Sequence, residues 1–551
     1  MCPLQHPGGL PRLSQHPIKT RRRAVALRLA SALAMACLAG AAACADSIPP
    51  APQPAAPPSS ESVDAPIAAG AAPAGVSSLL NPFPESLQQF GDQPFRAEAA
   101  TPPGTVPAPS STGPLGFLSA TWQSPNLLGD MEGLRPALAK YGVTLTILEN
   151  VETFGNLTGG VQQSLEPKGL TTVTLQMDTE KASGLKGGTL NVSGLQVYGG
   201  ELSTDNLMVL QTLSDIDAPI GVRLWELWYQ QKFGDKFDIK VGEQSLDEEF
   251  IIAPSGNSLF INGVSGWPGL PTVDLPGGGP AYPLAALGVR GRAQLMDSVT
   301  VLAGVFNGSP IPWDSPNTPR SNPHGVSFPL DTGTLAIAEL QYAFGSGASG
   351  KANADGPLPG NYKIGAWYNS YKFDDQQTDT IGLPLASPLS NGTPATHHGD
   401  FSLYGVVDQM IWRSKDNTNR SLNVFVRPMF TPYQDRNLVS ASINAGFALH
   451  APLPGRDNDL FGVEMGTVWA SSGASGFDRQ MQFYQPSVFT PIRSSETFLE
   501  ATYQIQVLPW WQIQPDVQYF INPGAGIANP NEPTQRIKNE LVIGLRTNIT
   551  F

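Results

Sequence analysis

The final thirteen residues, 539–551, alternate between apolar and polar side chains along almost their whole length. One parity holds Leu541, Ile543, Leu545, Thr547, Ile549 and Phe551. The other parity holds Glu540, Val542, Gly544, Arg546, Asn548 and Thr550. Because successive side chains of a strand point to opposite faces, this segment has one oily face and one wet face. Such a strand, ending on an aromatic residue, is typical of the last strand of an outer-membrane β-barrel. A half-buried closing strand of a soluble sandwich is the alternative.

The first 45 residues predict a signal peptide. A basic stretch, 19–23, precedes an apolar run, 24–33, and a series of small residues that ends in Ala43-Cys44-Ala45. A small-x-small triplet at this place fits a cleavage site. Lipidation at Cys44 is the alternative. We therefore expect export and a mature chain that starts after Ala45.

Composition excludes several classes of function. All three cysteines, Cys2, Cys37 and Cys44, lie in the predicted leader, so no disulfide, thiolate metal site or cysteine nucleophile is expected. The leader holds six basic residues and no acidic one, which leaves 33 − 6 = 27 Lys and Arg against 46 Asp and Glu. The resulting net charge of −19 argues against nucleic acid as a partner. We expect no metal and no cofactor.

The region before the alternating segments divides into two parts. Residues 46–113 are rich in Pro, Ala and Ser, so we expect a disordered linker. Residues 114–142 are expected to form a short helical segment, with the helix at Leu127–Tyr141. After the leader, no uncharged apolar run approaches the roughly 20 residues of a membrane helix, which leaves a soluble exported protein or a barrel.

Residues 143–551 are expected to form the barrel. Alternation recurs throughout this region, most clearly at 500–507 and 511–519. Tight connections alternate with long ones, as short periplasmic turns and long extracellular loops would. The fold class that we predict is all-β, an antiparallel transmembrane barrel of about sixteen strands. The expected strand starts are 143, 171, 188, 222, 236, 284, 298, 334, 361, 400, 420, 438, 459, 495, 510 and 539.

The polar side chains at alternate positions of each strand should line the pore. In the segment 223–233 the inward positions hold Glu226, Trp228, Gln230 and Lys232, while Trp225, Leu227, Tyr229 and Phe233 would face lipid. A charge that faces lipid near the midplane costs roughly 2–4 kcal/mol, so charged wall residues are expected to point inward. The same rule places these side chains inside: Arg290, Arg292, Glu339, Asp408 and Arg427.

A wall with charges of both signs, amides and tryptophans suits sugars. Hydroxyl groups both accept and donate hydrogen bonds, and aromatic faces can shelter the apolar face of a sugar ring. A generic polar lining without substrate preference is the alternative.

The long connection 245–283 combines an acidic start at Asp247, Glu248 and Glu249 with Trp267 and many Pro and Gly residues. A connection of this length and stiffness is not expected to move freely in solvent. We expect that it folds inward and narrows the channel. An ordered lid on the outer rim is the alternative.

Several motifs in order along the chain carry a resemblance to a known family. They are L-W-E-L-W at 224–228, D-E-E-F at 247–250, G-W-P at 266–268, Y-P-L-A-A-L-G-V-R at 282–290 and G-V-F-N-G at 304–308. From about 127 to 551 the chain resembles the carbohydrate-selective porins of the OprB type. The resemblance implies a sixteen-stranded outer-membrane barrel through which sugars, glucose-like monosaccharides in particular, diffuse passively into the periplasm. It also implies a constriction of charged and aromatic residues, here at Glu226, Trp228, Asp247, Glu248 and Arg290.

The predicted substrate pathway combines both lines of reasoning. Its residues are Glu226, Trp228, Gln230, Asp247, Glu248, Trp267, Arg290, Arg292 and Arg427. Phe551 is the predicted membrane-assembly signal. The expected partners are small sugars, outer-membrane lipid and the barrel-assembly machinery.

Alternatives are a general non-selective porin, a soluble periplasmic sugar-binding β protein and an outer-membrane enzyme. Catalysis is not expected, because the chain after the leader holds only four histidines and no Gly-x-Ser-x-Gly elbow at a strand-to-helix turn.

Overall fold

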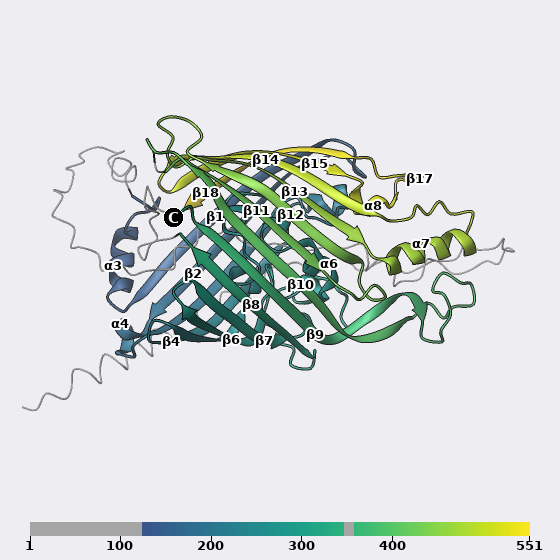
Figure 1. Cartoon of the computed structure of the whole chain (residues 1–551), viewed down its shortest axis with the longest axis horizontal. Helices are drawn as coiled ribbons and strands as arrows, with labels where there is room; N and C mark the ends of the chain where they lie inside the picture. Colours follow the sequence, from purple (N-terminus) through teal and green to yellow (C-terminus); the bar gives the residue numbers. More distant parts are fainter. Residues whose placement is uncertain (1–123, 346–356, 418) are drawn as a thin grey trace, which may run out of the picture.

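The computed structural model describes residues 124–345, 357–417 and 419–551, in which sixteen strands form one closed antiparallel barrel. Around the barrel the order is β1-β18-β15-β14-β13-β12-β11-β10-β9-β8-β7-β6-β5-β4-β3-β2, so that β1 and β18 close the wall (Figure 1). The predicted fold class and strand number are confirmed. The predictions for 1–45 and 46–113 fall outside the described residues.

The strand bounds agree with the expected starts to within six residues. The strands of the barrel are β1 (Val143–Thr158), β2 (Leu165–Asp178), β3 (Gly188–Gly199), β4 (Gly221–Phe233), β5 (Phe237–Gln244), β6 (Ala286–Met296), β7 (Val299–Asn307), β8 (Thr334–Phe344), β9 (Gly360–Asp379), β10 (Pro394–Arg413), β11 (Ser421–Phe430), β12 (Val439–His450), β13 (Leu460–Ala470), β14 (Ser495–Leu508), β15 (Trp511–Ile521) and β18 (Glu540–Thr550).

The alternation of the sequence corresponds to two chemically different faces of the wall. On β8, Leu340 is 46% exposed while the preceding Glu339 is 1% exposed. On β9, Ile364 is 64% exposed and Lys363 is 8% exposed. Apolar side chains therefore cover the outside, where lipid would lie, and polar ones point inward. No helix among the described residues is long and apolar enough to cross a membrane.

Trp225 corrects the predicted parity of β4. It was expected to face lipid, but it is 1% exposed and its ring lies 6.4 Å from that of Tyr282 inside the barrel. The cause is a register shift between β3 and β4, where Ser193 pairs with Glu226 and the next residue, Gly194, pairs with Leu224. The extra residue of this bulge turns Trp225 inward, because one inserted residue reverses the parity of all that precede it.

Short helices lie at both ends of the barrel (Figure 1). At the short-turn end, η2 (Met131–Gly133) and α3 (Leu134–Ala139) replace the longer helix expected at Leu127–Tyr141. The turn between β2 and β3 carries α4 (Thr179–Ser183). At the opposite end, the connections expected as loops contain α7 (Ser472–Tyr484), the four-residue turn α8 (Pro523–Gly526), the 3-10 turn η7 (Pro319–Ser321) and the small hairpin of β16 (Ala528–Asn529) and β17 (Glu532–Arg536).

Two connections from the long-loop end enter the barrel. The first, 200–220, contains η3 (Ser203–Leu207) and was not expected to lie inside. The second, 245–285, contains the remaining short elements. They are η4 (Leu246–Glu248), α5 (Pro254–Asn257), η5 (Gly263–Ser265), α6 (Gly269–Asp274) and η6 (Pro276–Gly278).

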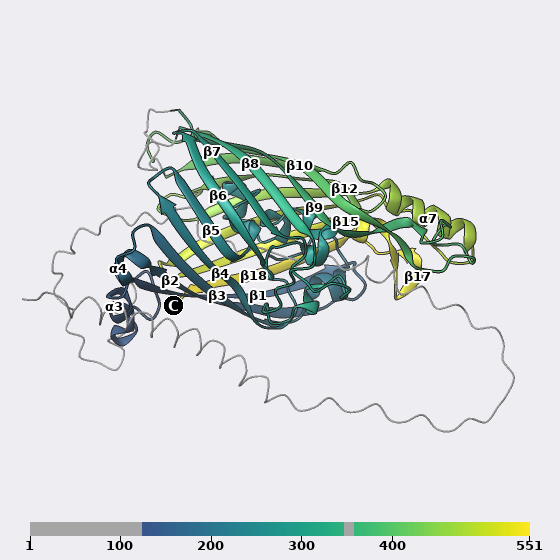
Figure 2. The same cartoon turned by 90° about the horizontal axis from the view of Figure 1, so that it is seen from below.

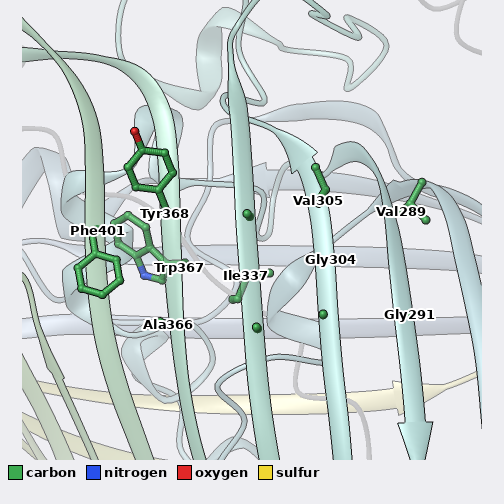
Figure 3. A pocket seen from close by; sticks show the side chains of 12 residues that line it. Val289, Gly291, Gly304, Val305, Ile337, Ala366, Trp367, Tyr368 and Phe401 are labelled. Carbon is green, nitrogen blue, oxygen red and sulfur yellow. The ribbon is translucent and has the colours of Figure 1, made fainter.

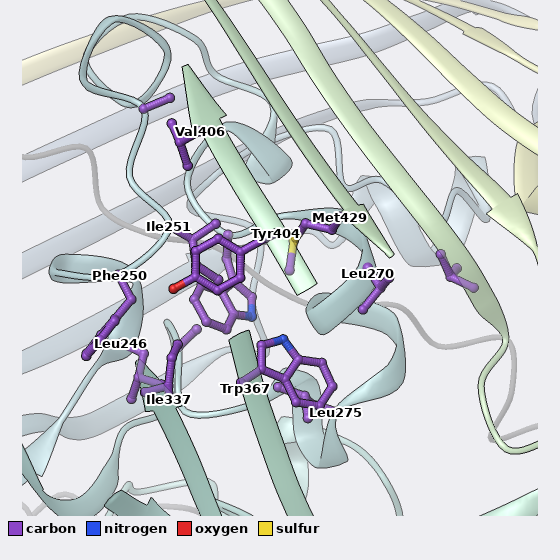
Figure 4. Close-up of a cluster of buried hydrophobic side chains, with 14 of the residues drawn as sticks. Leu246, Phe250, Ile251, Leu270, Leu275, Ile337, Trp367, Tyr404, Val406 and Met429 are labelled. Atoms are coloured by element: carbon purple, nitrogen blue, oxygen red, sulfur yellow. The ribbon is translucent and has the colours of Figure 1, made fainter. Parts of the chain in front are cut away.

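An apolar cluster inside the barrel joins the second connection to the wall (Figure 4). Phe250 and Leu270 of the connection pack in it with Trp367, Tyr404 and Met429 of the strands. Trp367 of β9 points inward, where it is only 2% exposed and contacts apolar side chains. Much of the lumen is therefore a packed core rather than open water.

Candidate constriction site

The connection 245–285, here called the inward loop, is held by carboxylates of the wall. On β8, Glu339 accepts a hydrogen bond from the backbone N–H of Ile251 at 2.8 Å. On β14, Glu500 accepts from the N–H groups of Ile261 and Asn262 at 2.7 and 3.0 Å. Further contacts join Asp408 to Ser255, Glu464 to Ser265 and Gln514 to Leu259. Because β8 and β14 lie far apart around the wall, the loop spans the lumen, and the alternative of a lid on the outer rim is wrong.

Arg427 of β11 also holds the inward loop, but as a donor of hydrogen bonds to backbone carbonyls of the loop. Its guanidinium donates to the backbone oxygens of Ile251 at 3.0 Å, Ser265 at 2.9 Å and Gly266 at 3.4 Å, and also to that of Val264. The side chain is 0% exposed. One arginine therefore satisfies carbonyls from two separate turns of the loop, which fixes their relative position.

The connection 200–220 is held in the same way. Glu496 of β14 accepts from the N–H groups of Leu210 and Gln211, each at 2.8 Å. Arg546 of β18 forms ion pairs with Asp215 of this connection and with Glu152 of β1. Arg546 thus ties the connection to the seam where the barrel closes.

Replacing Arg546 with Met should destabilise the protein strongly. The variant leaves Asp215 and Glu152 as buried carboxylates without their cation, and breaking a buried ion pair costs roughly 3–5 kcal/mol. The free energy of unfolding, measured by urea titration of the refolded barrel, should fall by that amount. Arg292→Met is the matched control, because its guanidinium is 38% exposed and lies 3.8 Å from Asp238. Equal losses of unfolding free energy in both variants would contradict the role of Arg546 as a buried ion-pair partner.

A second group of side chains gathers where the inward loop begins. Glu226 of β4 accepts from the N–H of Ser245 at 3.0 Å and from the indole N–H of Trp228 at 2.9 Å. The ammonium of Lys240 lies 4.2 Å from the centroid of the Trp228 ring. The wall therefore holds the first residue of the loop, and Trp228 carries a cation on one face.

Glu249 of the loop joins this group to β5 and β6. It pairs with Lys240 at 2.7 Å and with Arg290 at 2.5 Å. Arg290 also pairs with Asp238, which accepts a hydrogen bond from the amide of Gln230 at 2.9 Å. We call the resulting group the charged cluster. Its members are Glu226, Trp228, Gln230, Asp238, Lys240, Glu249, Arg290 and Arg292.

The remaining predicted pathway residues lie outside the charged cluster. Asp247 is buried at the start of the loop, where it accepts from the Ser245 hydroxyl at 2.5 Å and the Tyr282 N–H at 3.1 Å. Burial raises the pKa of Asp247 to about 7. Glu248 follows it in η4 and is partly exposed. Trp267 is 1% exposed and donates to the carbonyl of Gly278 at 3.0 Å, within the loop.

The structure thus brings five predicted residues together, namely Glu226, Trp228, Gln230, Arg290 and Arg292. Three other members, Asp238, Lys240 and Glu249, were not among the predicted pathway residues, although Glu249 belongs to the acidic start of the connection that was expected to narrow the channel. Asp238 and Lys240 alternate with the outward Phe237, Ile239 and Val241 on β5, so the parity rule that found Arg290 would also have found them.

The charged cluster should persist in acid. Burial alone would raise the pKa of Glu249, but the positive charges of Lys240 and Arg290 outweigh it and lower the pKa to about 2 from an ordinary 4.5. A lowered folded-state pKa stabilises the fold above the unfolded pKa, and this stabilisation is lost as the pH falls towards about 2.

We therefore expect steady single-channel conductance from neutral pH down to about pH 4, and fluctuating conductance as the pH approaches 2. Planar-bilayer recordings across this range provide the measurement. Glu249→Gln, which lacks the titrating group, should show the fluctuation at every pH. A wild-type channel that becomes unsteady near pH 5 would contradict the prediction.

A closed sixteen-stranded barrel with an oily outer face and a lumen narrowed by an inward loop is a porin. The chain matches the family model described as "Carbohydrate-selective porin, OprB family" over residues 162–551. It belongs to this family, and it is a carbohydrate-selective porin of the Gram-negative outer membrane.

Individual relatives agree with this assignment. The chain is 23% identical to "Porin B" of Pseudomonas aeruginosa over 449 residues, which covers 78% of this chain and 92% of the relative. It is 23% identical to "Putative porin QuiX" of Acinetobacter baylyi over 452 residues, covering 77% of this chain and 93% of the relative. The structure of Pseudomonas putida OprB at high pH has the same fold, with a TM-score of 0.66 and 21% identity over 78% of this chain and 99% of that one.

Proposed function

We propose that this porin passes small uncharged sugars, glucose-like monosaccharides in particular, and that the charged cluster is its selective surface. The supporting observation is the balance of charge within the cluster. Three carboxylates stand against three cations, so the cluster offers many hydrogen-bonding groups with little net field. The acids are Glu226, Asp238 and Glu249, and the bases are Lys240, Arg290 and Arg292.

This arrangement suits a sugar better than an ion. A neutral polyhydroxylated solute can exchange its water for amides, carboxylates and guanidinium groups, while an ion gains no net attraction. The side chains of Glu249 and Arg292 are 21% and 38% exposed, so a solute can reach them. Trp267 and Arg427, in contrast, are 1% and 0% exposed, and we propose that they fix the shape of the loop instead.

Liposome swelling tests the proposal. Proteoliposomes should swell quickly in glucose, more slowly in disaccharides, slowest in trisaccharides, and slowly in amino acids of the size of glucose or smaller. The double variant Glu249→Gln/Arg290→Gln removes one charge of each sign, so the net charge is unchanged. It should lose much of the preference for glucose over amino acids while still conducting ions.

Arg436→Gln is the matched control, because Arg436 pairs with Asp435 in the short connection between β11 and β12 and not in the cluster. It should keep the wild-type preference. Equal swelling of the wild type in glucose and in amino acids of similar size would instead indicate a general non-selective porin. We further propose transport without catalysis.

We also propose that Phe551 is the residue through which the barrel-assembly machinery recognises this chain before outer-membrane lipid surrounds it. Two observations support a role at the closing seam. The N–H of Phe551 donates to the carbonyl of Ile147 on β1 at 2.9 Å, and Leu127 donates to the carbonyl of Thr550 at 2.8 Å. Phe551→Ala should reduce the fraction of folded barrel in outer membranes, scored by heat-modifiable migration, and Ile549→Ala should reduce it less.

The division of the chain into 1–45, 46–113, 114–142 and 143–551 stays a proposal. N-terminal sequencing of the mature protein tests its first boundary, with Asp46 as the expected first residue.

A further inference from the structure

Two buried carboxylates lie where the inward loop meets the wall at the long-loop end of the barrel. Asp274 is the last residue of α6, which packs against β12, and Asp400 belongs to β10. The connection between β11 and β12, residues 431–438, contacts both of them. It lies at the end of the barrel beyond which α7 projects (Figure 2). Neither carboxylate belongs to the charged cluster.

The register of β9 and β10 shows that Asp400 faces the lumen. Phe401 pairs with Tyr368, which is 47% exposed, and both residues line a shallow depression of about 570 Å³ on the outer wall (Figure 3). Asp400, the neighbour of Phe401, pairs with Asn369, and both of these side chains are 0% exposed. Because adjacent residues of a strand face opposite ways, Asp400 points into the barrel.

The carboxylate of Asp274 uses only one of its oxygens. Its Oδ1 accepts from the backbone N–H groups of Leu438 and Val439 at 2.9 and 3.1 Å. Its Oδ2 is buried and accepts no hydrogen bond from the residues that the structure describes. Burial raises the pKa of Asp274 well above its ordinary value, and the negative charge of Asp400 raises it further. The two carboxylates therefore lie close enough to repel each other.

Asp400 is likewise held through one oxygen. Its Oδ1 accepts from the amide Nδ2 of Asn437 at 2.8 Å and from the hydroxyl of Thr431 at 3.4 Å, and its Oδ2 has no partner in the described part of the chain. The same amide nitrogen donates to the hydroxyl of Thr431 and to the carbonyl of Tyr433, each at 3.1 Å. These contacts fix which way round the amide of Asn437 lies, and its Oδ1 is left without a partner there.

Three buried oxygen acceptors, from three segments of the chain, are thus left without a donor. They are Oδ2 of Asp274, Oδ2 of Asp400 and Oδ1 of Asn437. They gather in one place, because the amide of Asn437 binds Asp400 and the next residue, Leu438, binds Asp274. Asp400 and Asn437 are 0% exposed, and Asp274 is 8% exposed, so bulk water does not satisfy them. Buried acceptors without a donor are costly, above all when they are charged.

No cation of the described chain balances the two carboxylates. Neither Asp274 nor Asp400 forms an ion pair with a lysine, arginine or histidine among those residues. Arg436, in the connection 431–438, pairs instead with Asp435 at 2.9 Å and donates to the carbonyl of Gly399 at 2.6 Å. The site therefore combines two negative charges and three oxygens without a donor, and it lacks a positive partner.

We propose that Asp274, Asp400 and Asn437 hold one calcium ion between the inward loop and the wall. Ca²⁺ binds carboxylate and amide oxygens in flexible geometry, whereas Mg²⁺ demands near-ideal octahedral geometry and keeps several waters. The two carboxylates match the charge of the ion, and water completes its shell on the side where Asp274 reaches solvent. The ion thereby joins α6 to β10 and to the connection 431–438.

Asn437 distinguishes this site from a simple acidic cluster. Within residues 124–345, 357–417 and 419–551, no three side chains of His, Cys, Asp or Glu are grouped to hold a metal. The amide oxygen of Asn437 is therefore the third protein ligand. Sequence patterns do not predict such a site, because its members lie far apart in the chain.

Isothermal titration calorimetry with CaCl₂ tests the site. The mature chain, refolded from urea so that no lipopolysaccharide carries cations, should bind one ion per chain. The expected dissociation constant is roughly 10⁻⁴–10⁻³ M, the range of extracellular calcium modules. Asp274→Asn and Asp400→Asn keep the hydrogen-bonded oxygen and remove one charge each, so each should weaken binding at least about tenfold. A wild type that binds no Ca²⁺, or binding that both variants retain, would overturn the proposal.

Asp379→Asn is the matched control. Asp379 is also buried at the long-loop end, but both of its oxygens accept hydrogen bonds. The donors are the backbone N–H of Leu383 for Oδ1 and the hydroxyl of Ser390 for Oδ2, at 2.7 and 2.8 Å. This variant should keep the wild-type affinity, and an equal loss here would place the ion elsewhere. Heat-modifiable migration checks that every variant folds.

Single-channel recordings of the wild type give a measurement that needs no variant. Removing Ca²⁺ with EGTA should make the open-channel current noisier, because α6 loses one of its links to the wall. Adding Ca²⁺ back should restore the steady current, and Asp274→Asn should stay noisy with or without the ion. A wild-type current that is equally steady with Ca²⁺ and with EGTA would show that no ion fixes the loop.

Discussion

Replacing residues 254–275 of the inward loop with a short Gly-Ser linker is expected to raise single-channel conductance several-fold and to abolish discrimination between sugars. The replaced segment carries the loop contacts to β10, β13, β14 and β15, so its removal opens the cross-section that it now fills. Conductance grows with the open cross-section. Planar-bilayer recordings and liposome swelling on the same preparation measure both effects.

A deletion elsewhere separates loss of the constriction from general damage. Residues 380–393 connect β9 and β10 at the long-loop end and lie outside the lumen contacts described above. Their replacement with the same linker should leave conductance near the wild-type value. An unchanged conductance in the 254–275 variant would mean that the inward loop does not limit the passage.

Arg427→Met should lower the free energy of unfolding by roughly 3–5 kcal/mol, because several buried carbonyls lose their donor together and each buried group left without a partner costs about 1–3 kcal/mol. The guanidinium now serves carbonyls of Ile251, Ser265 and Gly266. Methionine fills a similar volume but donates nothing. Urea unfolding and refolding in detergent provides the measurement, and noisier open-channel current should accompany the loss as the loop loosens.

The control for this prediction is Lys181→Met. Lys181 pairs with Asp178 at 3.8 Å beside α4, and the two side chains are 63% and 44% exposed. An exposed ion pair contributes about 0–1 kcal/mol, so the variant should unfold close to the wild type. A loss of unfolding free energy at Arg427 no larger than that at Lys181 would mean that Arg427 does not fix the loop.

Most of the barrel could be predicted from the sequence because the rule behind it is local. A period of two along each strand places lipid-facing and inward side chains, as Glu339 and Leu340 illustrate. The rule fails where the backbone adds a residue. The bulge opposite Ser193 and Gly194 turns Trp225 inward. The sequence of β4 alone does not predict this bulge. α7 was missed for a related reason, since Gly, Ser and Ala at its start suggest a loop.

The site could be predicted only in part, because its members meet through long-range contacts. Glu226 and Trp228 lie on β4 and Arg290 lies on β6, with β5 between them, and all three belong to the charged cluster, as the alternation along these strands predicted. The inward orientation of Arg427 was predicted from the alternation as well, but the groups that it binds were not. It binds Ile251, which is 176 positions away in the chain, across the lumen. No local pattern indicates which carbonyls a buried guanidinium will serve.

The wall carboxylates that hold the inward loop come from strands made late in synthesis, including β14, far from the loop itself. The constriction formed by the inward loop therefore cannot form before these strands are in place, whatever conformation the loop sequence alone favours. The inward loop therefore reaches its final arrangement only after β14 and β15 have joined the wall. A barrel arrested before these strands join would lack the contacts, and its lumen would stay wide.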